Sequence, residues 1–296
     1  MKLTLDVTGI DLRATLHPLA VYRSDPTNHL TANQFARATL TPDGPATVLV
    51  NWRDDTASVE LWGDGESWLA DRMEAMLGLA DDVSGFVPEH KAIARMWRQH
   101  SGMRMCASHT LWHDVAWLIP GQRVTGQDAA RQWAAVCRKF SEPSPGPLEL
   151  LLPPAPEAVA GAHYTDFHRL GIERQRAENL RAAARFIPRF AAMTDLPSDE
   201  LRAKLELVHG VGPWTATNVL TMTTGDPDAV VIGDYGIPSV ATWNLAGQRV
   251  GTDQEMLELL EPFRPNRWRV MRLLMAAGAH PPRRGPKIKN PRIARV

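Results

Sequence analysis

The chain has 296 residues, of which 44% are hydrophobic and 22% charged, and its 33 basic side chains balance 33 acidic ones. These ordinary values for a soluble globular protein exclude disorder throughout, because such a chain buries a sizeable core. No apolar run approaches the roughly 18 residues that span a bilayer. Its two cysteines, Cys106 and Cys137, exclude a disulfide framework, a four-cysteine zinc site and a cysteine-bound iron–sulfur cluster. We expect a cytoplasmic protein with no membrane partner.

The N-terminal residues 1–64 are expected to form a small antiparallel β domain. Apolar and polar residues alternate in the segments 2–7, 36–40, 46–52 and 57–61, and turns separate the later ones. Such a period of two is typical of half-buried strands, and at the N-terminus it indicates a strand, not a signal peptide. The segment 11–22 is compatible with a helix or with a loop, interrupted at Pro18.

From about Gly65 the apolar period becomes helical, and residues 65–282 are expected to form an all-helical body of eight or more helices. Ala177, Leu180, Ala184 and Ile187, for example, share one helix face. The last segment, 283–296, carries six basic residues and no acid. Such a basic tail either binds phosphate or is a solvated, frayed terminus.

The sequence Gly210-Val211-Gly212 separates two predicted helices, one over about 198–208 and one that begins at Pro213. Two glycines around one apolar residue permit a tight hairpin, since glycine adopts positive φ without strain. The second helix then points free N–H groups outward, where a DNA phosphate fits without base selectivity. Taken alone this is weak evidence, because many helix–helix turns contain the same glycines.

About twenty residues later, a β-branched run, Val230-Val231-Ile232, ends in Gly233-Asp234-Tyr235. This places one carboxylate on an extended segment that returns past the hairpin, just before the next helix. Considered by itself, Asp234 is better explained as an N-cap of the helix that starts at Gly236.

In combination these features resemble the helix–hairpin–helix DNA glycosylases, and most of all their DNA-3-methyladenine glycosylase II subgroup. The resemblance is clear from roughly residue 60 to 278. It covers the β domain, a helix beginning near 121–125, the Leu170-Gly171-Ile172 segment, the hairpin, the Gly233-Asp234 loop and a final helix after Pro265. It implies an α+β fold, with the small sheet packed on a two-lobed helical body and a cleft between the lobes.

The resemblance implies hydrolytic excision of a damaged base, an alkylated purine, from double-stranded DNA. Asp234 would be the catalytic carboxylate, because breaking the N-glycosidic bond builds positive charge on the sugar. Trp214 stands where bifunctional relatives carry a lysine that forms a Schiff base, so no lyase step is expected. An indole there would belong to the base pocket, unless Trp214 is simply a core residue.

The same resemblance assigns the residues around the flipped base. Arg123 takes the place of the wedge, usually apolar in the subgroup, and is otherwise a plain surface arginine. Gln122 would probe a neighbouring or opposite base. Asn218 and Met275 stand where relatives carry aromatic pocket walls, which leaves Tyr235 beside Asp234. The expected DNA contacts are therefore Gln122, Arg123, Thr125, Gly210, Val211, Gly212 and Thr215; the expected pocket is Trp214, Asn218, Tyr235 and Met275.

No cofactor is expected, except for a structural monovalent cation held by the backbone carbonyls of Glu206, Val208 and Val211, as the resemblance implies. His109 and His113 have a helical ligand spacing, but the residues between them lack the Glu of a metalloprotease, so zinc is not expected. A monomer is expected. The alternatives left open are a catalytically inactive protein that binds DNA lesions, and a glycosylase for oxidised or deaminated bases.

Overall fold

The computed structural model describes residues 1–277 and 280–282, so the basic tail from Arg283 lies outside the described part. Its N-terminal part is a five-stranded antiparallel sheet in the order β1-β5-β4-β3-β2. The strands are β1 (Lys2–Asp6), β2 (Asn28–Leu30), β3 (Gln34–Thr41), β4 (Gly44–Arg53) and β5 (Thr56–Trp62). The predicted small sheet is confirmed. The segment 11–22 contains α1 (Leu12–Leu16) and the 3-10 helix η1 (His17–Leu19), and Pro18 is the second residue of η1.

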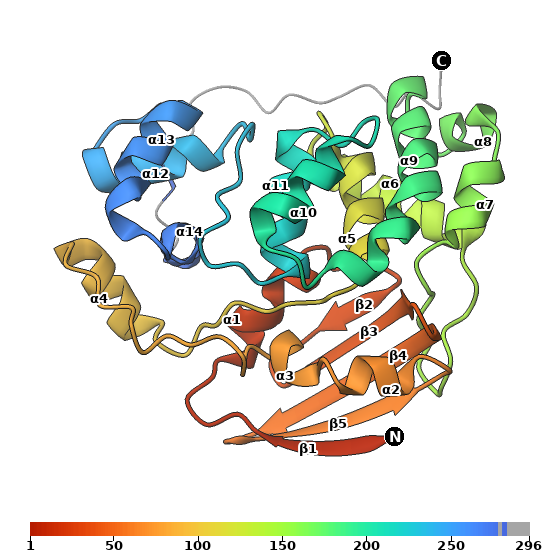
Figure 1. Ribbon diagram of the computed structural model, residues 1–296, viewed down its shortest axis with the longest axis horizontal. Coiled ribbons are helices and arrows are strands. Elements are labelled where there is room, and N and C mark those ends of the chain that lie inside the picture. The colour runs from red at the N-terminus through yellow and green to blue at the C-terminus, as the bar shows by residue number, and fades with distance from the viewer. Residues whose placement is uncertain (278–279, 283–296) are drawn as a thin grey trace.

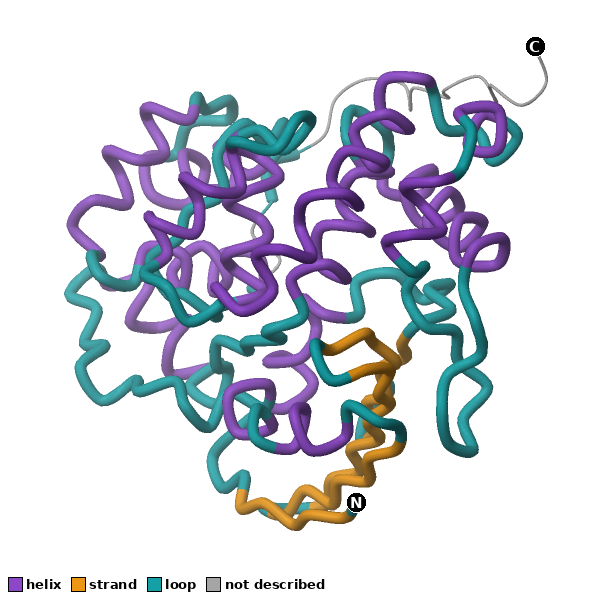
Figure 2. Tube along the Cα trace, turned by 45° about the vertical axis from the view of Figure 1, so that its right-hand side comes forward, coloured by secondary structure: helices purple, strands orange, loops and turns teal. Residues whose placement is uncertain are grey.

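Helices make up most of the remaining described chain, and the strands lie together at one end of the molecule (Figure 2). They are α2 (Glu66–Ala70), α3 (Met73–Met76), α4 (Lys91–Gln99), α5 (Leu111–Leu118), η2 (Ile119–Gly121), α6 (Gly126–Phe140), α7 (Pro156–Gly161), α8 (Tyr164–His168), α9 (Arg174–Phe186), η3 (Ile187–Met193), α10 (Ser198–Glu206), α11 (Pro213–Thr223), α12 (Ile237–Ala246), α13 (Asp253–Leu260), η4 (Glu261–Phe263) and α14 (Arg267–Ala276). The predicted α+β class is confirmed.

The apolar core forms two main clusters. The first joins the sheet to α5, α6, α9, α10 and α11 through residues such as Val50, Val115 and Leu180, all fully buried. The second joins α4 to α12, α13 and α14, which lie apart from the sheet (Figure 1). Trp214 packs against both clusters. The first turn of α11 therefore stands where the two helical groups meet.

A buried ion pair fixes the sheet to the first cluster. Arg37 on β3 donates to Asp114 on α5 at 2.8 Å, and the two side chains are 1% and 0% exposed. Asp114 also accepts hydrogen bonds from the hydroxyls of Ser108 and Thr223. The carboxylate is thus surrounded by donors, which a buried charge requires.

His113, the second histidine of the candidate pair, is fully engaged in this core. Its ring nitrogens lie 3.1 Å from the Thr27 hydroxyl and 3.2 Å from the Thr39 hydroxyl. In the chain as described, no three His, Cys, Asp or Glu side chains are grouped to hold a metal ion. Within the same residues, no helix is both long and apolar enough to span a membrane.

Candidate functional site

Asp234 lies at the start of α12 with both carboxylate oxygens engaged. Oδ1 accepts the backbone N–H groups of Gly236 at 2.8 Å and Ile237 at 3.0 Å. Oδ2 accepts the indole N–H of Trp214 at 3.0 Å. The carboxylate therefore accepts the N–H groups of the N-cap residue Gly236 and of the first helical residue, and it also faces the first turn of α11. Asp234 is thus not the N-cap residue of α12, but its segment does return to the first turn after the hairpin.

The loop that carries Asp234 is held from a second side. Gly233 has φ +77°, and its N–H donates to Asp253 Oδ2 on α13 at 2.8 Å. A Cβ on Gly233 would stand 3.4 Å from the Trp214 Cβ, so the loop runs close against α11. The β-branched run 230–232 before it lies in a loop without strand pairing, with Val230 and Val231 buried in the second cluster.

The hairpin between α10 and α11 forms as predicted. Gly210 has φ +84°, and the Val211 N–H closes the turn onto the Val208 carbonyl at 2.9 Å. In the described chain, the backbone N–H groups of Gly212, Trp214 and Thr215 donate to no protein acceptor. Such free donors at a helix start form an anion site. Val211 and Thr215 are each only 2% exposed, so the side chain of neither residue reaches a phosphate.

Gln122, the predicted base probe, has its amide engaged within the protein. Its Nε2 donates to the Gly210 carbonyl at 2.8 Å and to the Thr215 hydroxyl at 2.9 Å. Its Oε1 accepts from Asn179 Nδ2 at 3.0 Å. Both N–H donors of the amide are thus used inside the protein, while Oε1 keeps one lone pair; contact with a base stays a prediction.

Arg123, by contrast, projects freely. It is exposed and has φ +57°, a conformation uncommon outside glycine. Thr125, two residues later, caps α6 by accepting the Asp128 N–H at 3.2 Å and is exposed. Arg123 is thus exposed in the loop that precedes α6, and its role as the wedge stays a prediction.

The candidate pocket residues do not all converge. Trp214 is half-buried between the two clusters, and Asn218, one turn later on α11, donates to the Trp214 carbonyl at 2.8 Å. Met275 on α14 is half-buried and packs against the second cluster. Tyr235 is 103% exposed, so the prediction that it lines the pocket is wrong for the unliganded molecule. The short loop from Asp234 to Gly236 turns its ring outward.

The sequence analysis did not predict two residues that contact this site. Asn179 and Asp253 each bind a loop that belongs to the site, the first through Gln122 and the second through Gly233. A Thr252–Glu255 capping box marks the start of α13. No sequence signal links either residue to its distant partner.

The backbone carbonyls proposed for a monovalent cation lie in the hairpin turn. That of Val208 already accepts the Val211 N–H. A carbonyl has a second lone pair, so this contact is compatible with a cation. The cation stays a prediction.

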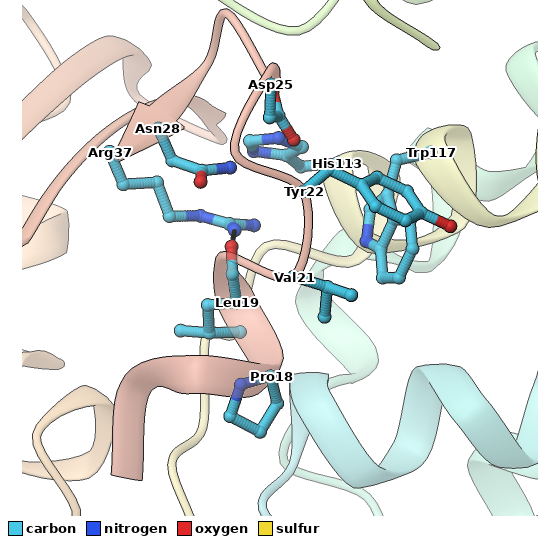
Figure 3. Close-up of a pocket in the computed structure, with 9 residues that line it drawn as sticks. All are labelled: Pro18, Leu19, Val21, Tyr22, Asp25, Asn28, Arg37, His113 and Trp117. Carbon is cyan, nitrogen blue, oxygen red and sulfur yellow. Dashed lines mark hydrogen bonds between the residues drawn. The ribbon is translucent and has the colours of Figure 1, made fainter. Parts of the chain in front are cut away.

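A small cavity lies elsewhere, between the segment after α1 and the sheet (Figure 3). Its lining includes Asp25, Asn28, Arg37 and His113, and its volume is about 10 Å³. That is room for about one water molecule. None of its lining residues is a predicted site residue, and a nucleobase does not fit.

Comparisons with known proteins agree on the fold. No family model matches the sequence. A 3-methyladenine DNA glycosylase from Archaeoglobus fulgidus superposes with a TM-score of 0.77 at 16% identity, over 92% of this chain and 97% of that one. An 8-oxoguanine glycosylase/lyase from Clostridium acetobutylicum, solved with DNA containing cytosine opposite 8-oxoguanine, gives a TM-score of 0.71 at 12% identity, over 94% and 97%.

A curated Bacillus subtilis protein, YfjP, provisionally named a DNA-3-methyladenine glycosylase, is 23% identical over 150 residues, 49% of this chain and 51% of its own length. The match thus spans about half of that relative. Together these findings show that the chain has the fold of the DNA glycosylases, as its sequence motifs predicted.

Proposed function

We propose that the protein is a monofunctional DNA glycosylase that hydrolyses the N-glycosidic bond of a damaged base, an alkylated purine, in double-stranded DNA. The observation that carries this proposal is the position of Asp234. Its carboxylate faces Trp214, two residues beyond the Gly210–Gly212 hairpin, at the point where the two core clusters meet. The fold shared with DNA glycosylases supports the same assignment.

The chemistry of the proposed reaction needs a fixed negative charge. Asp234 accepts three N–H donors, which suit an ionised carboxylate because that form only accepts. Oδ2 has a single partner and thus keeps capacity for the sugar or for water. As the base leaves, positive charge develops on the sugar, and a preorganised carboxylate stabilises it. The same oxygen can take a proton from the attacking water.

The hairpin supplies the anchor for the DNA strand. In the described chain, the N–H groups of Gly212 and Trp214 have no protein acceptor and lie at the start of α11, where the helix dipole favours an anion. A phosphate held there would lie close to the turn that contacts Asp234. Backbone contacts of this kind position a strand without reading its sequence. A flipped nucleotide would thus meet the carboxylate from a defined direction.

The pocket side chains favour a purine but differ from an aromatic cage. Trp214 offers an indole face, which attracts a cationic alkylated base. Asn218 donates one of its two amide N–H groups to the Trp214 carbonyl, so its second N–H and its amide oxygen, an acceptor, are left for a base. Excision of an oxidised or deaminated base remains the second candidate, favoured by this acceptor.

The absence of a lyase step rests on Trp214. An indole has no amine with which to form a Schiff base, so water is the proposed nucleophile. The Clostridium acetobutylicum neighbour is named a glycosylase/lyase, and this residue is what separates the two chemistries in our proposal. We further propose that Arg123 fills the gap left by the flipped nucleotide, and that the protein acts as a monomer in the cytoplasm.

A base-release screen tests the proposal. The protein is incubated with duplexes that each carry one alkylated, oxidised or deaminated base, and free bases are quantified by mass spectrometry. We expect release of an alkylated purine and an intact abasic strand, with no borohydride-trapped protein–DNA adduct. Release of none of the bases would favour the inactive lesion-binding alternative, and a trapped adduct would refute the monofunctional mechanism.

A further inference from the structure

The loop before α6, residues 121–125, is joined to the hairpin by the side chain of Gln122, and we infer that Gln122 is a positioning residue for the wedge. It couples the exposed Arg123 to the hairpin, so that strand anchoring and base unstacking work from one rigid unit. This inference rests on the proposed glycosylase function. It assigns Gln122 a role inside the protein in place of contact with a base.

The contacts of Gln122 span distant parts of the chain. Its two donors bind the Gly210 carbonyl and the Thr215 hydroxyl, which lie 88 and 93 residues away. One acceptor belongs to the hairpin and the other to the first turn of α11. Because a carbonyl can only accept, the contact with Gly210 also fixes which end of the amide faces the hairpin. The residue that precedes the wedge therefore has a defined orientation.

A second layer holds Gln122 in place. Asn179 on α9, 7% exposed, donates to Gln122 Oε1 and itself accepts from Gln175 at 2.9 Å. Asn179 occupies the space in which a Cβ on Gly210 would stand, with its Cγ only 2.3 Å from that position. Gly210 thus has two roles. It forms the turn, and its lack of a side chain leaves room for Asn179. Four segments, namely the loop, the hairpin, α9 and α11, meet around one amide.

The residue just before the loop is held by a separate contact. Arg176 on α9, 3% exposed, donates to the Pro120 carbonyl and to Gln132 Oε1. Arg123 directly follows these attachments at Pro120 and Gln122 and precedes Thr125, the N-cap residue of α6; it is exposed and has φ +57°. A non-glycine residue keeps such a backbone only where its surroundings determine it. The attachments at Pro120 and Gln122 provide that determination.

This arrangement predicts that DNA binding and base unstacking respond differently to the loss of Gln122. A contact that only stabilised the fold would affect both. The hairpin N–H groups that would bind phosphate do not involve Gln122, so DNA affinity should survive its loss. The direction in which Arg123 points depends on Gln122. Loss of the amide should therefore slow unstacking and excision while leaving binding nearly unchanged.

The test uses Gln122→Met, which keeps the length of the side chain and removes both donors. The matched control is Gln127→Met, since Gln127 is an exposed glutamine on α6. Binding is measured by fluorescence anisotropy with lesion DNA. Unstacking is measured by the fluorescence of 2-aminopurine beside the lesion, and excision by single-turnover base release. Thermal unfolding verifies that each variant is folded.

We expect Gln122→Met to unstack and excise about 10-fold more slowly, the effect of losing two neutral hydrogen bonds, with binding within about 2-fold of wild type. Gln127→Met should match the wild type. In an Arg123→Ala background, Gln122→Met should cause no further loss, because its effect passes through Arg123.

Unstacking at the wild-type rate in Gln122→Met would overturn the inference, as would a proportional loss of binding or a full additional loss in the double variant. If the wild type unstacks the lesion but releases no base, the proposed function fails while this coupling is still measured. If the wild type releases base and Gln122→Met equals it, only the coupling fails.

Discussion

At the scale of single residues, Gly210 meets two requirements at once. Its φ of +84° lies in a region that residues with a side chain rarely adopt, and a Cβ at this position would overlap Asn179. The sequence analysis predicted the first requirement from the Gly-x-Gly pattern. It could not predict the second, because Asn179 precedes Gly210 by 31 residues and only the packed fold brings them together.

Gly210→Ala should destabilise the protein by about 2 kcal/mol or more, from backbone strain and overpacking together. Gly126→Ala is the control, because nothing lies within 4 Å of its added Cβ. The free energy of unfolding in urea measures both. Equal stability of the Gly210 variant and the wild type would contradict the structure of the hairpin.

Trp214 has a second residue-scale role, since its indole N–H is the only side-chain donor to Asp234 in the described chain. Trp214→Phe keeps an aromatic face and removes that donor. We expect excision to slow by about 10-fold, the cost of one charge-assisted hydrogen bond, with little change in DNA affinity. Trp243→Phe on α12, whose tryptophan is 36% exposed, should behave as wild type. Single-turnover excision rates are compared. If Trp214→Phe excised the base at the wild-type rate, the indole N–H would have no part in the mechanism.

The exposed Tyr235 and the engaged Gln122 lie differently from what the sequence analysis expected of them. Both roles came from the order of residues along a motif, which gives position in the chain but not the direction of a side chain. That direction depends on loop geometry and on partners 57 to 93 residues away in the case of Gln122. Asp234 and Trp214 were placed well because they flank elements whose ends the sequence marks clearly.

At the scale of elements, alternation and helix caps predicted most of the secondary structure. β3, β4 and β5 follow the predicted alternating segments, and α11 begins at Pro213 as expected. β2 was missed because its three residues are too few to show a period. The 230–232 run has the composition of a strand but no partner, so it stays a loop.

The junction between β3 and α5 depends on the ion pair of Arg37 and Asp114. Arg37→Met should cost about 3–5 kcal/mol of unfolding free energy, because it leaves a buried carboxylate unpaired. The double variant Arg37→Met/Asp114→Leu should recover a large part of that loss. Urea unfolding of the three proteins gives the answer, and a double variant as unstable as Arg37→Met would show that the pair is not the cause.

The same junction predicts a pH dependence through His113. Burial, reinforced by the charge of Arg37, lowers the pKa of His113 well below its usual 6.5. As pH falls below 6.5, His113 binds a proton in the unfolded chain but not in the folded protein, so the free energy of unfolding decreases. Burial raises the pKa of Asp25 and Asp114, which acts in the opposite direction.

Comparison with His113→Gln isolates the histidine, because the other groups remain in both proteins. Between pH 7.5 and 5.5 the wild type should lose about 1 kcal/mol more unfolding free energy than the variant. Unfolding in urea at the two pH values measures this difference. Parallel pH profiles would show that His113 is not the group responsible.

At the scale of the whole molecule, the two clusters explain why a site forms where it does. α11 belongs to the first cluster and α12 to the second, and the segment between them carries Asp234 back to Trp214. The two-lobed arrangement came from the resemblance, since no periodicity in the sequence reports how helices group. The sheet shares the first cluster, which its own alternating pattern could not show.

The most direct measurement of the central claim is single-turnover base release by Asp234→Asn. Asparagine can still cap α12 through its oxygen but carries no charge. We predict at least a 100-fold slower excision with unchanged or tighter lesion binding, since an electrostatic stabiliser of the transition state is lost. Asp195→Asn, a site whose side chain is 74% exposed, should remain active. Full activity of Asp234→Asn would contradict the account.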